Sequence, residues 1–209
     1  MVIKYTSNVV SPPVLLYMGV DKHENEHLIK YGWPEDVWFH VDKLSSAHVY
    51  VRLPDGMTID SMPEELVEDC AQLVKANSIE GNKINNVDVV YTMWGNLKKT
   101  GDMAIGQVSF HVPRNVKKTK VEKRKNEIIN RLNKTEKKEE IDYKAERDER
   151  DAKERQAQRK ADQLRKEREN KEAAEREKIR KTRNYEDVDW ENTSANQTND
   201  DGNLSDDFM

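Results

Sequence analysis

The sequence predicts an α+β fold: an antiparallel sheet with packed helices at the N-terminal end, followed by a long charged α-helix and a disordered acidic tail. Turn-forming residues are confined to the front of the chain, since every Pro lies at or before Pro113 and seven of the eight Gly lie at or before Gly106. Two runs in this part alternate with a period of two, which is typical of strands with one face in a core. From Val121 to Asn184 the chain has no Pro or Gly and consists chiefly of strong helix formers. These observations divide the chain into a domain at residues 1–115, a charged helix or coiled-coil region at 116–184 and a tail at 185–209.

The elements of the domain are bounded by residues that end strands and helices. Pro12 and Pro13 separate the first two strands, and Gly32 ends a short helix. Pro63 stands in the first turn of an amphipathic helix. The expected strands are 2–7, 15–18, 37–41, 49–53, 87–92 and 107–112, and the expected helices are 24–31 and 63–79.

The strands at 37–41 and 49–53 give the sheet two different faces. Val37, Phe39 and Val41 point to one side and form a core face. When the two strands pair, the opposite face carries the side chains of Trp38, His40, His48, Tyr50 and Arg52. Two interpretations stay open. Either these side chains form a second core under helices, or they form a surface where rings stack on bases while the guanidinium and nearby lysines meet phosphates.

The segment behind the domain has the charge pattern of an isolated helix. In a series of nine pairs between Glu127 and Lys181, an acidic residue precedes a basic residue by four positions. Each pair stabilises an exposed helix by about 0.2–0.5 kcal/mol. A coiled coil needs an apolar seam, and after Leu132 the apolar positions lose the heptad spacing. We therefore favour a single long helix over a coiled-coil dimer.

Charge is distributed unevenly along the chain. Residues 1–121 hold 13 Lys and Arg against 15 Asp and Glu, residues 122–184 hold 23 against 17, and residues 185–209 hold none against 8. Cations gather where the domain meets the helix, and such a cluster neutralises phosphates unless it is merely a solvated face. The candidate nucleic-acid contacts of this kind are Lys98, Lys99, Lys117, Lys118, Lys120 and Lys123, with Arg124 and Lys125 beside them.

Several functional classes lack support in the sequence. There is no CxxC, HxxxH or HExxH spacing for a metal, no GxxxxGK or GxGxxG loop for a nucleotide cofactor, and no GxSxG nucleophile motif. We expect no catalytic residues, no metal, no cofactor and no small-molecule substrate. The single cysteine, Cys70, and the absence of an apolar N-terminal run or a membrane-spanning stretch indicate a cytoplasmic protein. A nuclear pool, or membrane association through partners, is the alternative.

The ordered series of motifs resembles the NFACT-R domain family. The residues that carry the resemblance are DVWFHVDKLSSAHVYVRL from Asp36 to Leu53, preceded by YMGVDKHENEHLI and followed by VEDCAQLVKANS, VDVVYT and NLKKTGDMAIGQVSFH. The family motif D-x-W-F-H-x-x-x-x-P-G-S-H-V is matched by Asp36, Trp38, Phe39, His40, His48 and Val49. Ser45 and Ser46 stand where the family has Pro-Gly.

This resemblance implies an α+β domain that binds nucleic acid without catalysis. The family is associated with RNA, transfer RNA and the large ribosomal subunit. Our hypothesis is a non-enzymatic adaptor that binds structured RNA, transfer or ribosomal, with the ribosome or a protein bound through the long helix as further partners. The alternatives are a DNA-binding protein that acts at a membrane through partners, and a structural coiled-coil interaction protein.

Overall fold

The computed structural model describes residues 1–183, so the predicted acidic tail at 185–209 lies outside the described residues. The chain divides into two units, Met1–Asp151 and the part that begins at Ala152. The first unit holds the sheet and its helices. The second contains the greater part of the long helix, which is α4 (Tyr143–Arg183).

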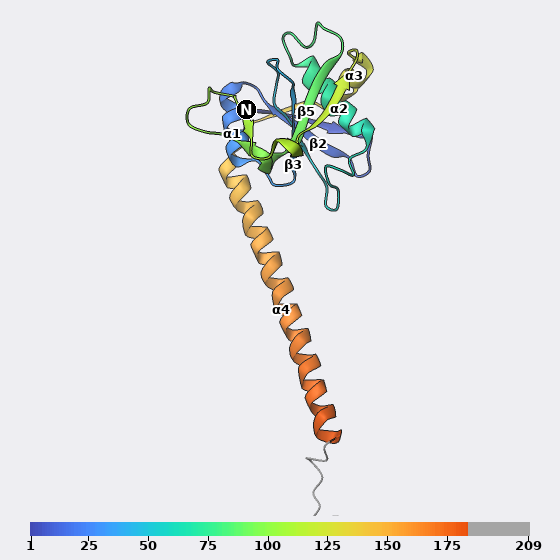
Figure 1. Ribbon diagram of the computed structural model, residues 1–209, viewed down its shortest axis with the longest axis vertical. Coiled ribbons are helices and arrows are strands. Elements are labelled where there is room, and N and C mark those ends of the chain that lie inside the picture. Colours follow the sequence, from blue (N-terminus) through green and yellow to red (C-terminus); the bar gives the residue numbers. More distant parts are fainter. Residues whose placement is uncertain (184–209) are drawn as a thin grey trace, which may run out of the picture. The chain divides into compact units, whose positions relative to one another are not determined.

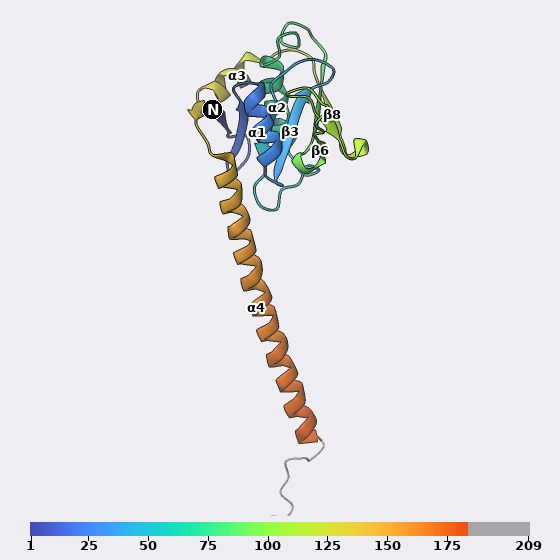
Figure 2. The ribbon, with the colours of Figure 1, turned by 90° about the vertical axis from the view of Figure 1, so that its left-hand side faces the viewer.

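The first unit is built on a seven-stranded antiparallel sheet, as the sequence predicts. Its strand order is β8-β5-β3-β4-β2-β1-β9, with β8 on the side opposite the N-terminus (Figure 2). A separate two-stranded sheet pairs β6 with β7. The strands are β1 (Val2–Ser7), β2 (Val14–Gly19), β3 (Asp36–Val41), β4 (Val49–Arg52), β5 (Val87–Met93), β6 (Leu97–Lys98), β7 (Ser109–Phe110), β8 (Lys117–Val121) and β9 (Lys137–Glu139).

Helices begin and end where local chemistry requires it. The helices of the first unit before α4 are α1 (Lys22–Tyr31), α2 (Glu64–Ala76) and α3 (Asn126–Asn133). The Asp21 carboxylate caps α1 by accepting from the backbone N–H groups of His23 and Glu24, at 2.8 and 2.9 Å. Gly32 follows α1, where a Cβ atom would overlap the indole ring of Trp94. This close approach explains the glycine at the end of the helix.

The sheet is covered on both faces, and Figure 1 shows α1 and α2 on different sides of β3. On one face, core side chains of the sheet pack in one cluster with Leu66 and Leu73 of α2 and Leu132 of α3. On the other face, Leu28 of α1 and Leu97 of β6 belong to a second cluster. Alternation along β3 and β4 therefore separates two cores rather than a core from solvent.

The long helix begins later than the sequence predicts. Residues 116–142 do not continue one helix: β8 pairs with β5, α3 packs on α2, and β9 pairs with β1. The cause is burial of the few apolar side chains in this segment, since Val121, Ile129 and Leu132 are all buried. The strand expected at 107–112 is also shorter, and it forms β7 outside the main sheet.

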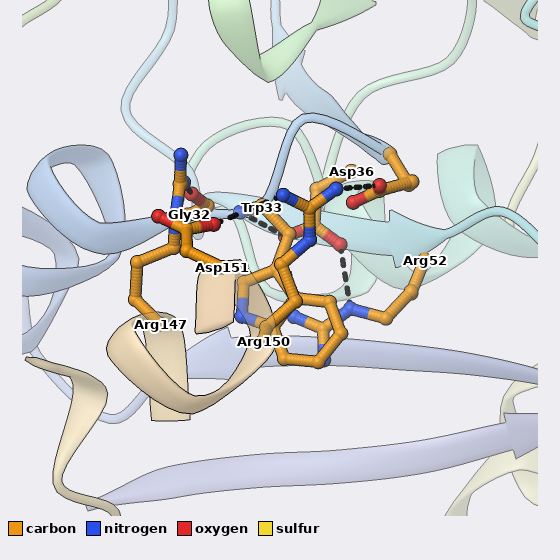
Figure 3. A network of polar contacts seen from close by, with 8 residues as sticks. Gly32, Trp33, Asp36, Arg52, Arg147, Arg150 and Asp151 are labelled. Atoms are coloured by element: carbon orange, nitrogen blue, oxygen red, sulfur yellow. Dashed lines mark hydrogen bonds and ion pairs between the residues drawn. The ribbon is translucent and has the colours of Figure 1, made fainter. Parts of the chain in front are cut away.

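The first turns of α4 belong to the first unit. The Tyr143 ring stacks on His27 with centroids 5.8 Å apart, and its hydroxyl donates to Glu24 at 2.5 Å. Arg147 donates to the carbonyl of Gly32 (Figure 3). Arg150 forms an ion pair with Glu35. The folded domain therefore extends well beyond residue 115.

Candidate nucleic-acid interface

The predicted aromatic face is the second core. Trp38 is 2% exposed and Tyr50 is fully buried. The Tyr50 ring stacks on Tyr17 at 5.2 Å, and Trp38 meets the edge of Phe110 at 5.7 Å. Between the two interpretations of this face, the structure shows the buried one. Neither ring is on the surface, where it would have to be to stack on a base.

Two histidines complete this core as neutral groups. The Trp38 indole N–H donates to Nδ1 of His48 at 2.9 Å, and the His40 ring stacks on Trp38 at 5.4 Å and lies 4.9 Å from the His48 ring. Burial, reinforced by the neighbouring His40, lowers the pKa of His48 to about 3. Burial also lowers the pKa of His40. At neutral pH these residues carry no positive charge for a phosphate.

Arg52 lies in a buried network around Asp36 (Figure 3). The fully buried Asp36 carboxylate accepts from Nε of Arg52 at 3.0 Å, from the Tyr17 hydroxyl at 2.5 Å and from the backbone N–H of Trp33 at 2.8 Å. The guanidinium also lies 3.5 Å from the centre of the Trp33 ring. Its charge is therefore matched within the domain.

The turn that replaces the family's Pro-Gly is held by serine hydroxyls. The Ser46 hydroxyl accepts from the backbone N–H of Val41 and donates to the carbonyl of Ala47, both at 3.1 Å. The Ser78 hydroxyl donates to the carbonyl of Ser45 at 2.6 Å. Side-chain hydrogen bonds thus fix a connection for which the family motif uses a tight Pro-Gly turn.

The two lysines of β6 and its flank differ. Lys98 is exposed, whereas the ammonium group of Lys99 donates to Glu26 at 2.8 Å and to the carbonyls of Ala104 and Gln107 at 2.7 and 3.0 Å. Lys99 therefore holds the loop before β7 against α1. Only Lys98 of this pair is placed to meet a ligand.

Strand β8 carries its lysines on both faces of an edge strand. Lys117 lies on the α2 side and pairs with Asp60 at 2.5 Å, and Lys118 lies on the opposite side and pairs with Asp42 at 2.8 Å. Lys120 and Lys123 are exposed, and no carboxylate among residues 1–183 forms an ion pair with them. The lysines predicted from sequence are thus not one uniform patch.

Around β8 runs a stretch that we call the basic segment, residues 114–125. It holds seven basic residues and one acidic residue, Glu122. Arg114 was not among the predicted contacts, although it is exposed at the start of this stretch. Arg124 donates to the side-chain oxygen of Asn82 at 2.9 Å, and Lys125 pairs with Glu68.

A groove with a volume of about 960 Å³ lies between α2 and β8, and we call it the α2–β8 groove. Lysines of the basic segment form one wall, and Asp60, Glu64, Glu65 and Glu68 come from the loop before α2 and from α2 itself. Tyr91 of β5 also lines it. Its two walls lie about 50 residues apart in the chain, so the sequence alone does not reveal this site. The facing residues of α2 carry no motif of their own.

Two further observations concern the described residues only. No helix within residues 1–183 is long and apolar enough to cross a bilayer. In the same part of the chain, no three side chains of the metal-binding types lie close enough together to hold an ion.

The chain is similar to a known RNA-binding domain family and, in part, to a solved structure. A family model described as the NFACT protein RNA binding domain matches residues 1–112. A solved structure, the C-terminal part of the fibronectin/fibrinogen-binding protein from Streptococcus suis, is 21% identical over 61% of this chain and 48% of that chain, with a TM-score of 0.49. A likeness of this degree carries no argument about function.

Curated relatives extend the match to the whole chain. Coiled-coil domain-containing protein 25 of Mus musculus is 54% identical over 211 residues, covering 100% of both chains. The protein of the same name from Danio rerio is 62% identical over 155 residues, covering 74% of this chain and 75% of the relative. The chain belongs to the coiled-coil domain-containing protein 25 family.

Proposed function

We propose that the protein is a non-enzymatic RNA-binding adaptor whose basic segment contacts the phosphates of structured RNA, such as transfer or ribosomal RNA. The observation that carries this proposal is the excess of seven basic residues over one acidic residue in the basic segment, which includes the edge strand β8. The family model supports RNA as the ligand class. A ribosomal partner is part of the same proposal.

Edge protection alone does not account for this charge. Lysines on an edge strand prevent pairing with other strands, and both edges of this sheet carry them. Around β9, however, acidic residues balance the lysines: residues 134–142 hold three basic and four acidic residues, and Lys138 pairs with Glu136 at 3.4 Å. Around β8, Arg114, Lys120 and Lys123 keep exposed charges without such partners in the described structure. The surplus on the β8 side is therefore the feature that selects a polyanion.

The burial of Trp38 and Tyr50 makes phosphate contacts the main source of affinity in this proposal. Cations that neutralise phosphates release counterions, so the binding constant falls steeply with salt. Each lost phosphate contact lowers the slope of log K against log salt by about 1. The salt slope therefore reports how many lysines take part.

The test uses the full chain and a fluorescent RNA hairpin, titrated between 50 and 200 mM salt. The variant Lys120→Glu with Lys123→Glu is expected to bind more weakly and to lower the slope by about 2. The matched control is Lys134→Glu with Lys137→Glu at the β9 side, since both residues are exposed and the change in net charge is the same. No binding at 50 mM salt, or equal losses in both variants, would refute the proposal.

A duplex DNA of equal length separates the two nucleic acids. Tighter binding of the RNA hairpin supports the proposal. Tighter binding of the DNA, lost in the Lys120→Glu and Lys123→Glu variant, would replace RNA by DNA as the ligand of the same surface.

A further inference from the structure

The α2–β8 groove contains an aromatic ring that is partly exposed, unlike the buried rings of the second core. The ring of Tyr91 packs parallel to Phe39, with centroids 4.9 Å apart and an angle of 7°. Phe39 comes from β3, and the strand order β3, β5, β8 directs the other face of the Tyr91 ring toward β8. Tyr91 is half-buried, and its hydroxyl has no hydrogen-bond partner among the described residues. A second flat group can therefore extend the stack that Phe39 begins.

A lysine of β8 lies next to the Tyr91 ring. Lys117 is the register partner of Tyr91 on β8, and its ammonium group pairs with Asp60 at 2.5 Å. The Asp60 side chain is 80% exposed, and ion pairs of this kind are weak. A phosphate can thus replace the carboxylate at little cost. Lys117 would then hold a phosphate while the ring holds a base.

Carboxylates on the opposite wall determine how a nucleotide would be oriented in the groove. Glu64 and Glu65 lie in the first turn of α2, exposed and without an ion-pair partner in the described part of the chain. Their carboxylates repel a phosphate backbone but accept hydrogen bonds from N–H groups on the edge of a base. A nucleotide in the groove therefore places its phosphates along β8 and its base edge toward α2.

The acidic wall also distinguishes between bases. A carboxylate has two oxygens that accept hydrogen bonds side by side. Guanine presents two adjacent N–H donors, N1 and N2, on its Watson–Crick edge, and no other RNA base does so. In a duplex this edge is paired, so the base must be unpaired to reach the groove. A volume of about 960 Å³ is ample for one nucleotide.

We propose that the α2–β8 groove binds an unpaired guanine nucleotide of RNA, with its base stacked on Tyr91, a phosphate on Lys117 and its Watson–Crick edge on the α2 carboxylates. This inference rests on the proposed function, and it adds which part of an RNA the protein recognises. It also identifies the stacking residue, which lies outside the buried face predicted from sequence.

The first test measures binding of the full chain to fluorescent ten-residue oligouridines at 50 mM salt, one with a central guanosine and one with a central adenosine. The guanosine oligonucleotide is expected to bind more tightly. Loss of a stacked base costs about 5- to 150-fold in affinity, so Tyr91→Leu should lose this much with an unchanged salt slope. Tyr91→Phe should bind like the natural protein. Glu64→Gln with Glu65→Gln should abolish the preference for guanosine.

A second measurement needs no variant. Photo-crosslinking of the full chain to the same oligonucleotide with 6-thioguanosine at the centre, followed by peptide mapping, is expected to mark the peptide that contains Tyr91. Crosslinks confined to peptides outside the groove would overturn the inference, even if Tyr91→Leu lowers thermal stability.

The outcomes separate this inference from the proposed function. If Tyr91→Leu binds as tightly as the natural protein, or if guanosine and adenosine bind equally, the groove is not the proposed site. The proposed function then still stands, provided that Lys120→Glu with Lys123→Glu weakens binding of the hairpin. If the natural protein binds neither RNA at low salt, the proposed function itself fails.

Discussion

Truncation of the chain at residue 112, where the match to the family model ends, is expected to prevent folding. The deleted part begins just before β8 and includes α3, β9 and the first turns of α4. Strand β8 covers the edge of β5, and α3 lies on α2 and β1. A fragment of residues 1–112 would thus expose both edges of the sheet, at β5 and at β1, and part of its larger core.

The size of the loss follows from the buried side chains. Val121, Ile129 and Leu132 are 5%, 4% and 0% exposed, and burial of such a side chain contributes about 1.5–3 kcal/mol. Together they contribute about 5–9 kcal/mol, an upper estimate because unfolded chains are already partly compact. Arg131 also donates to the buried carboxylate of Asp69 at 2.5 Å. Because the Arg131 side chain is 37% exposed, loss of this pair costs less than the roughly 3–5 kcal/mol of a fully buried one, and it adds to the apolar loss. A domain of this size has a total stability of about 5–15 kcal/mol.

The assay is thermal unfolding followed by circular dichroism, on the full chain, on residues 1–151 and on residues 1–112. Residues 1–151 include the whole first unit and should unfold cooperatively near the temperature of the full chain. Residues 1–112 should show no cooperative transition. If this fragment unfolds cooperatively within about 5 °C of residues 1–151, the segment after residue 112 contributes less than about 2 kcal/mol, and the reasoning is refuted.

Three further predictions concern single features. Asp36→Asn should cost about 2–3 kcal/mol in urea unfolding because it removes a fully buried carboxylate from a partly buried guanidinium, whereas Asp88→Asn on the exposed side of β5 should cost less than about 1 kcal/mol. The pKa of His48 is about 3 in the folded state, below its usual value of 6.5, so the folded state binds fewer protons than the unfolded state. Stability from this group is complete above pH 6.5 and decreases by up to about 1.4 kcal/mol per pH unit as the pH falls toward 3. The variant His48→Gln should lack this decrease, measured by urea unfolding between pH 6.5 and 4.5. Light scattering should find the full chain monomeric, because Leu164 and Ile179 of α4 lie 15 residues apart and no heptad places both on the a and d positions; a stable dimer would favour the coiled-coil alternative.

The central strands were predictable because they are apolar and alternate. Val37, Phe39 and Val41 specify β3, and the flanking Gly and Pro specify the turns. The edge strands were not predictable in the same way. The sequence of β8 is KKTKV and that of β9 is KKE. Edge strands carry such charges because charged side chains prevent pairing with further strands. Such charges, without Pro or Gly between them, look like the continuation of a charged helix.

The candidate site, like the sheet, could be predicted from the sequence only in part. Spacing alone cannot show whether the side chains opposite a core face meet solvent or a second layer, and Trp38 and Tyr50 proved to meet α1 and the β6–β7 sheet. The clustering of lysines was visible in the sequence. Their pairing with Asp42 and Asp60 was not, because those carboxylates come from distant turns.

The charge balance of the domain argues that its binding surface is local. Residues 1–151, the first unit, hold 25 acidic and 23 basic residues, so the domain as a whole does not attract a polyanion. At physiological salt, charges more than about 8 Å apart are largely screened. A phosphate against β8 therefore responds to the lysines beside it and hardly to acidic residues on the far side of the sheet. Charge reversal at Lys120 and Lys123 should therefore abolish phosphate contacts. Charge reversal at Lys134 and Lys137 changes the net charge equally and should leave these contacts intact. Affinity that depended only on total charge would fall equally in both variants, and the basic segment would then have no special role.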